Sequence, residues 1–545
     1  MQPKYIEMDT LLLLGDEAIA QGALDGGLSG IYAYPGTPST EITEYVRSSR
    51  YAEENNIHRE WSANEKTAME AALGMSYAGK RAMVCMKHVG LNVAADPFMN
   101  ASFTGVNGGL IVAVADDPSM HSSQNEQDSR FYGNFAGIPI FEPSNQQEAY
   151  EMAYCGFELS EQLKLPVLLR IPTRLAHSRS TVSCLEQKPQ NETAVPENLR
   201  QFVLLPVFAR KKYEALLSKQ ASMEEISGAF GFNKYFDGRD KQLGIIASGI
   251  AYNYVMEHYT KHKLEFPLLK ISQYPLPSRM LDRILDSCEK VLVVEEGYPF
   301  IEDRLKGFQG KGTPIKGKLD GTLPRTGEMN PDHVSAALGM EVKSGEAIPE
   351  VVKNRPPSMC AGCGHIESYK ALNEALREYS EGRVFSDIGC YTLGALPPFE
   401  TINSCVDMGA SITMAKGAAD AGLVPAVAVI GDSTFTHSGM TGLLDCVIEQ
   451  SPVTVIISDN FTTAMTGGQD SHALGRLEQI CEGIGVEKEH IHTFRPTKKN
   501  LDQMVQLIKK ELAYEGVSVI IPRRQCIQTA KDKGLNARLK ELGLK

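Results

Sequence analysis

The sequence predicts an α/β protein of three doubly wound domains with mainly parallel sheets. Short β-rich runs alternate with helical patterns along the whole chain. Several runs end in Gly or Asp, as the carboxyl ends of parallel strands often do where ligand-binding loops follow. Two polar stretches rich in Pro or Gly interrupt the alternation and separate three α/β regions. With 545 residues, 42% of them hydrophobic, the chain is long enough to bury several cores.

The predicted elements follow one another in chain order. A patch of four leucines, residues 11–14, is expected to begin an amphipathic helix. A helical insert is expected near residues 207–237. The candidate buried strands are residues 30–36, 81–86, 108–116, 166–172, 242–249, 290–296, 426–432, 452–460 and 517–524.

Changes in composition place the domain boundaries. The first domain is expected to cover residues 1–185, and residues 186–240 form a linker together with the helical insert. The middle domain covers residues 241–310. A second linker, residues 311–356, is rich in Gly, Pro and Lys, and the last domain covers residues 357–545.

Charge and hydropathy argue against two classes of partner. The formal net charge of −12 and the lack of any basic cluster argue against nucleic acid, because phosphate binding needs concentrated Lys and Arg. No apolar run in the sequence approaches the roughly 20 residues that a membrane helix needs. The first residues also lack the basic region and cleavage site of a signal peptide. We therefore expect a cytoplasmic protein with no nucleic-acid or membrane partner.

Four of the eleven cysteines lie in Gly- or Arg-rich contexts, namely Cys360, Cys363, Cys390 and Cys526. Cys360 and Cys363 form a C-x2-C pair, and His365 follows them. Such a pair fits half of a zinc site, a redox dithiol, two ligands of an iron–sulfur cluster, or no metal at all. The other cysteines stand singly in apolar or mixed surroundings and are expected to be small buried residues.

The strongest chemical signal is GDSTFTHSGMTGLLDCVIEQSPVTVIISDN, residues 431–460. One strand ends at Gly431 and Asp432, a helix follows, and a second strand ends at Asn460. Because neighbouring parallel strands end at the same edge of a sheet, Asp432 and Asn460 are expected to converge there. Their side-chain oxygens and the carbonyl of Thr462 suit a hard divalent cation that bridges a diphosphate. The alternative is a plain βαβ unit in which the Asp and the Asn only cap turns.

This stretch resembles the GDG-x(24–27)-NN signature of thiamine diphosphate (ThDP) enzymes, with Ser433 for the second Gly and Asp459 for the first Asn. The segment TTAMTGGQDS, residues 462–471, is similar to the T-G-G-Q-x-S segment of 2-oxoacid:ferredoxin oxidoreductases. The resemblance implies that Asp432, Asn460 and Thr462 bind Mg²⁺. The cofactor contacts that it implies are Gly431, Asp432, Ser433, Asn460, Thr462, Thr466, Gly467, Cys390 and Gly409.

The N-terminal part resembles the pyrimidine-binding domain of the same superfamily. The loop YAYPGTPSTEI, residues 32–42, is similar to its Y-P-x-T-P-S loop, which implies that Thr37 lies near the substrate carboxylate or the cofactor. In EWSANEKTAMEAALGMSYAG, residues 60–79, Glu65 corresponds best to the glutamate that activates ThDP. Glu60 is the alternative.

Three more side chains are candidates for handling the substrate. Lys87 and His88 follow a strand end, where they are expected to face the reactive carbon of the cofactor; the alternative is a solvated loop pair. Arg130 is a candidate for bidentate binding of a carboxylate, and a purely structural role is the alternative.

Longer strings indicate one branch of the superfamily. The strings at residues 86–97, 116–130, 386–398 and 431–439 resemble the large (α) subunit of indolepyruvate:ferredoxin oxidoreductase, and the resemblance covers essentially the whole chain. It implies a pyrimidine-binding, a transketolase-C-like and a diphosphate-binding domain. The implied reaction is oxidative decarboxylation of aryl pyruvates to acyl-CoA, with coenzyme A as cosubstrate. The implied partners are a small β subunit and ferredoxin or another low-potential carrier, in a dimer of heterodimers.

The resemblance also bears on the four cysteines. In related oxidoreductases a [4Fe–4S] cluster near ThDP is held by a C-x2-C pair, a cysteine shortly after it and a fourth much later, and Cys360, Cys363, Cys390 and Cys526 occur in that order. The large subunits of this family usually carry a C-terminal ferredoxin-like run of cysteines, which this sequence lacks. Electrons are therefore expected to leave through a separate partner, or the chain is a shortened family member with altered redox chemistry. The alternative functions are a non-oxidative ThDP-dependent decarboxylase and a non-catalytic scaffold subunit.

Overall fold

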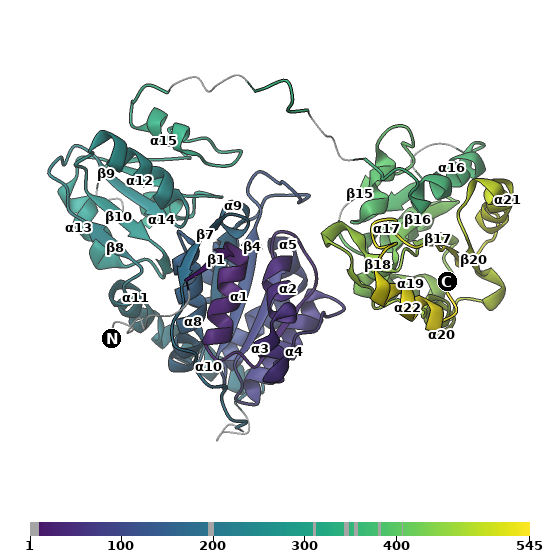
Figure 1. Ribbon diagram of the computed structural model, residues 1–545, viewed down its shortest axis with the longest axis horizontal. Coiled ribbons are helices and arrows are strands. Elements are labelled where there is room, and N and C mark those ends of the chain that lie inside the picture. The colour runs from purple at the N-terminus through teal and green to yellow at the C-terminus, as the bar shows by residue number, and fades with distance from the viewer. Residues whose placement is uncertain are drawn as a thin grey trace. The chain divides into compact units, whose positions relative to one another are not determined.

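The computed structural model describes residues 10–194, 201–308, 312–342, 348–353, 358–379, 383–405 and 407–544. Within these ranges the chain forms two compact units, residues 1–346 and 347–545 (Figure 1). Segments of both predicted linkers, among them residues 195–200, 343–347 and 354–356, lie outside the described residues.

The first unit contains a six-stranded sheet in the order β11-β5-β6-β4-β3-β2. All neighbours pair in parallel except β11, which is antiparallel to β5. The strands are β2 (Gly30–Ala33), β3 (Ala82–Lys87), β4 (Leu110–Asp116), β5 (Ile140–Phe141), β6 (Val167–Pro172) and β11 (Gln273–Tyr274). The helices between them are α1 (Gly15–Asp25), α2 (Thr40–Ser48), α3 (Arg50–Glu54), α4 (Glu65–Tyr77), α5 (His88–Val93), α6 (Ala95–Thr104), α7 (Arg130–Ala136), α8 (Gln146–Leu163) and α9 (Thr173–Ala176).

The four-leucine patch forms a strand, so the prediction of a helix start there is wrong. Residues 10–14 form β1 (Thr10–Leu14), which pairs antiparallel with β7 (Arg179–Ser183). Leu12 is exposed and Leu13 is buried, as expected where side chains alternate along a strand. The helix α1 begins only at Gly15, whose backbone packs against α9: a Cβ at Gly15 would lie 2.3 Å from the carbonyl oxygen of Leu175.

A second sheet of the same unit has the order β13-β12-β9-β10-β8, parallel except at β8. Its strands are β8 (Lys234–Phe236), β9 (Gly244–Ser248), β10 (Leu268–Ile271), β12 (Val291–Val294) and β13 (Ile315–Lys316). The associated helices are α10 (Pro206–Ser218), α11 (Gln220–Ala229), α12 (Ala251–His262), α13 (Ser278–Ser287), α14 (Phe300–Phe308) and α15 (Pro331–Ala337). A single hydrophobic cluster runs through both sheets, and β11, which follows β10, completes the first sheet.

The third sheet lies in the second unit and has the order β15-β14-β16-β17-β21-β20, with every neighbouring pair parallel. Its strands are β14 (Val384–Ser386), β15 (Ser404–Cys405), β16 (Ala426–Gly431), β17 (Val453–Ser458), β20 (Ile491–Phe494) and β21 (Ser518–Pro522). The helices are α16 (Gly364–Leu376), α17 (Ala410–Asp420), α18 (Asp432–Thr434), α19 (Met440–Ile448), α20 (Leu477–Ile484), α21 (Leu501–Leu512) and α22 (Lys533–Glu541). Shorter elements are η1 (Cys390–Ala395), the π-turn η2 (Phe435–Gly439), β18 (Thr462–Thr463), η3 (Ala464–Thr466), β19 (Gln469–Asp470), η4 (Lys488–His490) and η5 (Lys498–Asn500).

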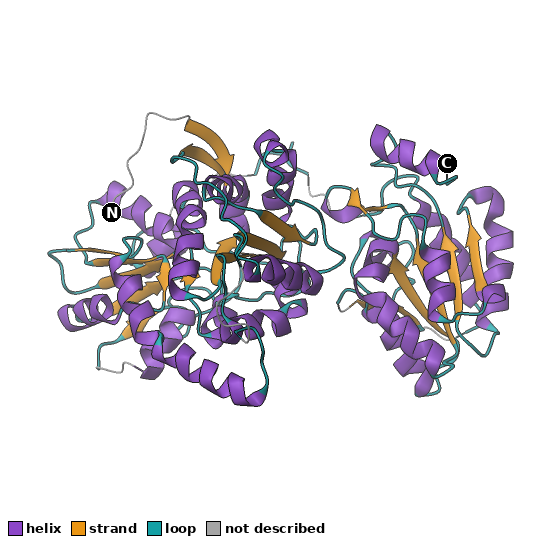
Figure 2. Ribbon diagram, turned by 90° about the horizontal axis from the view of Figure 1, so that it is seen from below, coloured by secondary structure: helices purple, strands orange, loops and turns teal. Residues whose placement is uncertain are grey.

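The third sheet is buried on both faces. Alternate residues of β16 belong to two separate hydrophobic clusters: Ala428 and Ile430 to one, Val427 and Val429 to the other. Because successive side chains of a strand point to opposite faces, the two clusters lie on opposite sides of the sheet. Figure 2 shows helices on both sides of its strands. The sheet is therefore doubly wound.

Each run predicted as a strand contains an observed strand, and the predicted α/β fold with mainly parallel sheets is confirmed. The helices α10 and α11 occupy the predicted helical insert. Short strands such as β5, β11, β14 and β20 were not predicted. The domain boundaries near residues 185, 240, 310 and 356 stay predictions. No helix in the described part of the chain is long and apolar enough to cross a membrane.

A buried ion network joins the two sheets of the first unit. Arg130 is fully buried, and its guanidinium donates to Asp128 (Nε–Oδ1, 2.9 Å) and to Glu295 (Nη1–Oε2, 3.0 Å). Arg170, also fully buried, donates to Asp116 (Nε–Oδ2, 2.6 Å) and to Glu142 (Nη1–Oε1, 2.5 Å). Because the network occupies the hydrogen-bond donors of Arg130, the structure supports a structural role for Arg130 rather than the binding of a substrate carboxylate.

We expect Arg130→Ala to destabilise the first unit by about 3–5 kcal/mol, because it leaves the carboxylates of Asp128 and Glu295 buried without their partner. Arg239→Ala is the matched control: its side chain is 89% exposed and lies 3.9 Å from Glu265, so the change should cost about 1 kcal/mol or less. Urea unfolding followed by circular dichroism measures both. Equal, small shifts of the two midpoints would contradict the role of the network.

Candidate active site

In the first unit, the predicted residues lie at the carboxyl ends of neighbouring strands. Thr37 lies in the loop between β2 and α2, Lys87 ends β3, and His88 begins α5. The loop after β4 joins them. Lys87 donates from Nζ to the carbonyl oxygen of Ser122 (2.6 Å), and the Ser122 hydroxyl donates to the carbonyl oxygen of Thr37 (3.1 Å). His88 Nε2 lies 3.2 Å from the carbonyl oxygen of Asn125.

The environment of Lys87 and His88 is buried, so neither is the solvated loop residue of the alternative reading. Lys87 is 8% exposed and His88 is 1% exposed. Burial lowers the pKa of Lys87 to about 8, although the nearby carboxylate of Asp117 acts in the opposite direction. The second ring nitrogen of His88, Nδ1, is buried and has no hydrogen-bond partner among the described residues. It therefore remains available to a bound molecule.

Glu65 and Glu60 have different surroundings. Glu65 begins α4 and is 5% exposed, and its carboxylate packs against α5: a Cβ at Gly90 would lie 2.6 Å from Glu65 Oε1. Only a glycine at position 90 leaves room for this side chain. Glu60 is exposed and forms an ion pair with Arg47 (3.1 Å). The structure thus favours Glu65 over Glu60 as a buried functional carboxylate beside the helix that begins with His88.

In the second unit, β16 and β17 are parallel neighbours, and Gly431 pairs in register with Ser458. This pairing brings Asp432 and Asn460 to one edge of the sheet, as the spacing of the motif predicts. Asp432 is 2% exposed, and its Oδ2 is buried without a hydrogen-bond partner in the described chain. Burial, with the neighbouring carboxylate of Asp459, raises the pKa of Asp432 well above its usual value. A buried carboxylate oxygen with no donor fits a cation ligand.

The other predicted metal ligands follow β17, the strand that neighbours β16. Asn460 is partly buried, and its Oδ1 accepts a hydrogen bond from the backbone N–H of Thr462 (3.0 Å). Thr462 is 2% exposed, and its hydroxyl donates to the carbonyl oxygen of Gln469 (2.8 Å). The side chains of Asn460 and Thr462 are therefore held in place by the segment that follows β17.

The predicted cofactor contacts surround the same edge. Ser433 accepts a hydrogen bond from the Thr463 hydroxyl (2.9 Å), which links it to the β18–β19 hairpin. In that hairpin the Thr466 hydroxyl donates to the side-chain oxygen of Gln469, and Gly467 has a φ of 120°, which favours glycine. Gly409 precedes α17 with a φ of 92°.

The four candidate cysteines line one pocket. The pocket has a volume of about 110 Å³, and Cys360, Cys363, Cys390 and Cys526 contribute to its wall together with Asp459 and Asn460. Burial raises the pKa of Cys390 to about 11, and the nearby thiols of the other three act in the same direction. The pocket therefore gathers four thiols from three distant stretches of the sequence.

The distances between the four sulfur atoms can be compared with those that a zinc ion requires. Among the described residues, no three of the four sulfurs lie within 4.8 Å of one another. Tetrahedral zinc with Zn–S bonds of about 2.3 Å holds its sulfurs about 3.8 Å apart. A four-iron cluster holds its cysteine ligands farther apart than a single ion does. In the described chain the sulfurs are therefore spaced more widely than the ligands of a single zinc ion.

Sequence reasoning missed Asp387, which follows β14. Asp387 is fully buried and accepts hydrogen bonds from the hydroxyls of Tyr391 and Ser411, the latter at 2.6 Å. Tyr391 in turn packs on Gly431, where a Cβ would lie 2.6 Å from the tyrosine ring. The available signals were the Asp of SDIGC, which follows a strand too short to be predicted, and the string at residues 386–398 that contains it.

His365, from the motif C-A-G-C-G-H, also lies at the cysteine pocket. It is 6% exposed and lines the pocket, with its ring 6.4 Å from that of Tyr391 in a T-shaped arrangement. Burial lowers the pKa of His365 to about 4. His365 is therefore neutral at physiological pH and adds no charge to the pocket.

Comparison with known families agrees with the two halves of this description. The family model "Pyruvate flavodoxin/ferredoxin oxidoreductase, thiamine diP-bdg" matches residues 21–210. The family model "Thiamine pyrophosphate enzyme, C-terminal TPP binding domain" matches residues 387–521, which include the edge with Asp432. These matches place a thiamine diphosphate-binding region in each unit.

Curated proteins and a solved structure are also similar to this chain. Indolepyruvate oxidoreductase subunit IorA of Archaeoglobus fulgidus is 38% identical over 549 residues, which cover 95% of this chain and 87% of that protein. The same subunit of Thermococcus kodakarensis is 38% identical over 565 residues, covering 95% and 86%. A structure of 2-oxoglutarate:ferredoxin oxidoreductase from Magnetococcus marinus has a TM-score of 0.50 at 18% identity, covering 61% of this chain and 65% of that one, and this likeness shows the fold.

The fold, the site and these matches define a thiamine diphosphate-dependent 2-oxoacid oxidoreductase. More specifically, the chain belongs to the family of indolepyruvate oxidoreductase subunit IorA.

We expect the stability of the second unit to depend on pH through Asp387. Burial raises the pKa of Asp387 to about 7, so the folded chain keeps a proton that the unfolded chain loses near pH 4. Stability should therefore fall by about 1.4 kcal/mol per pH unit between pH 5 and pH 7 as a contribution of this group. Asp387→Asn removes that contribution. Urea unfolding at pH 5, 6 and 7 measures the difference, and parallel pH curves for both chains would contradict the expectation.

Proposed function

We propose that this chain is the catalytic subunit of an oxidoreductase that oxidatively decarboxylates aryl pyruvates, of the indolepyruvate type, to acyl-CoA. The similar curated proteins are named indolepyruvate oxidoreductase subunit IorA, which supports the substrate class. Coenzyme A is the proposed acyl acceptor, and ferredoxin or another low-potential carrier is the proposed electron acceptor. A subunit designation also supports a small β subunit as partner, with a dimer of heterodimers as the proposed assembly.

The proposed cofactor ligands divide between the two units. In the second unit Asp432, Asn460 and the carbonyl of Thr462 hold Mg²⁺, and the buried oxygen of Asp432 without a partner supports this assignment. Gly431 and Ser433 lie at the start of α18, where backbone N–H groups suit a diphosphate. Bound ThDP supplies the carbon nucleophile and the electron sink for loss of CO₂.

The first unit supplies the proton-handling groups. Glu65 is the proposed partner of the aminopyrimidine ring, where its carboxylate holds a proton at the ring nitrogen N1′. Its burial beside Gly90 supports this role, because a dry carboxylate forms a stronger hydrogen bond than a solvated one. Lys87 is the proposed contact for the substrate carboxylate: with a pKa of about 8 it is mainly cationic at pH 7, and Ser122 orients it.

His88 and Thr37 complete the proposed substrate contacts. His88 presents its buried Nδ1, which has no partner among the described residues, to the substrate oxygen. The loop that bears Thr37 is held by Ser122, the residue that also holds Lys87. The loop that contains Ser122 therefore positions both Lys87 and Thr37.

The observation that supports an oxidative reaction is that the cysteine pocket shares residues with the sheet edge of the proposed Mg²⁺ ligands. Asp459 and Asn460 line the pocket of the four thiols, and the backbone N–H of Cys526 donates to the carbonyl oxygen of Asn460 (3.1 Å). Asn460 is also the proposed Mg²⁺ ligand. A [4Fe–4S] cluster held by Cys360, Cys363, Cys390 and Cys526 would thus adjoin the cofactor and accept its electrons one at a time.

We expect anaerobically purified chain to contain about four iron atoms and to absorb broadly near about 400 nm. Replacing one ligand, as in Cys363→Ala or Cys526→Ala, should remove most of this iron and the absorbance. Cys405→Ala is the matched control, because Cys405 belongs to the same unit and does not line the pocket. Iron analysis and visible spectra measure both.

An iron-free chain that still decarboxylates 2-oxoacids would overturn the oxidative proposal and support the non-oxidative decarboxylase instead. A chain whose melting temperature is unchanged by ThDP and Mg²⁺ would support the scaffold alternative.

We expect Glu65→Gln to lower the turnover number by about 10²- to 10⁴-fold, because the amide cannot take up the proton at N1′. Glu60→Gln, at the exposed alternative position, should change it less than about 2-fold. The assay is viologen reduction by the chain co-expressed anaerobically with a candidate small subunit. Indolepyruvate, phenylpyruvate, pyruvate and 2-oxoisovalerate, each with coenzyme A, form the substrate panel. Highest kcat/KM for pyruvate or 2-oxoisovalerate would contradict the proposed substrate class.

A further inference from the structure

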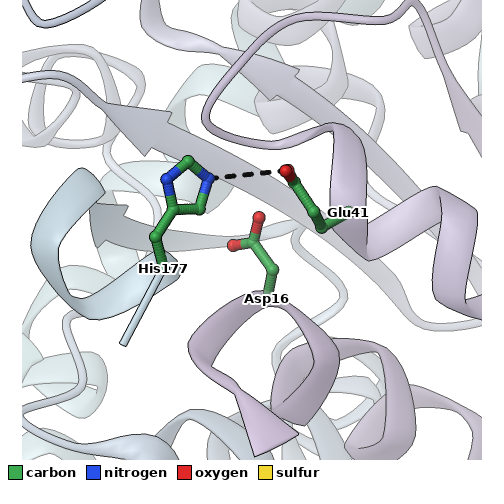
Figure 3. Close-up of side chains that lie close together, drawn as sticks. All are labelled: Asp16, Glu41 and His177. Carbon is green, nitrogen blue, oxygen red and sulfur yellow. Dashed lines mark ion pairs between the residues drawn. The ribbon is translucent and has the colours of Figure 1, made fainter. Parts of the chain in front are cut away.

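Three side chains of the first unit converge outside the residues assigned to catalysis. Asp16 lies in the first turn of α1, Glu41 lies in the first turn of α2, and His177 directly follows α9. One ligand atom from each lies within 4.8 Å of the others. Figure 3 shows the carboxylate of Asp16 pointing toward the space between the Glu41 carboxylate and the His177 ring.

The carboxylate of Asp16 lacks partners in the described chain. The residue is completely buried, and neither Oδ1 nor Oδ2 has a hydrogen-bond partner. A buried oxygen without a partner is costly in either protonation state, because a protonated carboxyl group also needs an acceptor for its hydrogen. The arrangement of Asp16 therefore indicates a missing ligand rather than a satisfied core carboxyl.

Glu41 and His177 border the space toward which the Asp16 carboxylate points. Glu41 Oε2 is buried without a hydrogen bond and lies 3.6 Å from His177 Nε2, as the dashed line in Figure 3 shows. The side chains of Glu41 and His177 are each 35% exposed, so water reaches one side of the cluster. Burial raises the pKa of Asp16, and the carboxylate of Glu41 raises it further. One ring nitrogen of His177 lies within 4.8 Å of an oxygen of each carboxylate.

We propose that Asp16, Glu41 and His177 bind a divalent transition-metal ion, such as Mn²⁺ or Zn²⁺. Two carboxylate oxygens and one imidazole nitrogen form a mixed donor set that these ions accept. The solvent-exposed side leaves room for water to complete the coordination. The site belongs to the first unit and shares no residue with the proposed Mg²⁺ ligands of the second unit.

The ion ties together three segments that position the candidate active site. Glu41 follows the loop of Thr37 by four residues, so the ion anchors the far end of that loop. His177 follows α9, and Thr173 at the start of α9 donates to the carboxylate of Asp117 (2.8 Å). Asp117 in turn accepts from the backbone N–H of Ser122, which holds Lys87 and Thr37. The ion is therefore a positioning element, since none of its ligands belongs to the proposed substrate contacts.

Pulsed EPR of the full-length chain loaded with Mn²⁺ tests this site without measuring activity. Mn²⁺ at Asp432, Asn460 and Thr462 has oxygen ligands, whereas Mn²⁺ at the proposed site is bonded to an imidazole nitrogen and should show ¹⁴N coupling. We expect this coupling in the wild-type chain and its loss in His177→Gln. Metal analysis after gel filtration should show about one Mn²⁺ fewer per chain in Asp16→Asn and Glu41→Gln.

Glu17→Gln is the matched control, because Glu17 neighbours Asp16 and instead accepts from the backbone N–H of Leu14 (2.8 Å). It should keep both the coupling and the metal content. If the wild-type chain shows no ¹⁴N coupling with Mn²⁺ and retains no additional Zn²⁺ relative to Asp16→Asn, the proposal is wrong.

Because His490, beside Glu487 and Glu489, can also supply a nitrogen ligand, the coupling must be lost in His177→Gln and kept in His490→Gln. If one variant fails to fold, the metal content of the other two variants of the site decides the question.

Discussion

Parallel pairing between strands determines where the polar side chains of this chain lie. Parallel strands end at one edge of their sheet, so a residue that follows one strand meets those that follow its neighbours. In the second unit this constraint brings Asp432 and Asn460 together after β16 and β17. In the first unit it brings Lys87, after β3, to the loops that follow β2 and β4. The candidate site residues of both units depend on this geometry.

Several charged side chains are buried in this chain, and their hydrogen-bond partners indicate what each side chain does. Arg130 and Arg170 lie among carboxylates that satisfy them, so they stabilise the contact between two sheets. Asp432 and Asp16 are equally buried, yet each has a carboxylate oxygen without a partner in the described chain. Among the described residues, Asp116 of the ion network also has one oxygen without a partner, but its other oxygen accepts from Arg170, whereas both oxygens of Asp16 lack a partner. An unsatisfied buried carboxylate is costly, so Asp16 in particular indicates a ligand.

The cysteine pocket and the sheet edge at the ends of β16 and β17 have residues in common. Asn460, which follows β17 at the sheet edge, lines the cysteine pocket, and its carbonyl oxygen accepts a hydrogen bond from the backbone N–H of Cys526. This proximity gives the four cysteines a physical connection to the chemistry of a thiamine diphosphate-dependent oxidoreductase.

Several features of the site were predictable because they depend on short stretches of sequence. The runs that form β3, β4, β16 and β17 are strongly apolar, and the polar residues at their ends follow directly. The motif favoured Glu65 over Glu60, but the burial of Glu65 against Gly90 was not predictable, because it depends on packing between α4 and α5.

Hydrophobic periodicity acts over a few neighbouring residues, so it was enough to predict the α/β class, the main strands and the residues at their carboxyl ends. No local pattern indicates that the leucine patch is a strand, because its partner β7 lies far along the chain. The packing of distant elements also surrounds Arg130 with an ion network and brings Asp16, Glu41 and His177 together. Contacts between distant segments depend on how whole elements pack, and no local pattern records them.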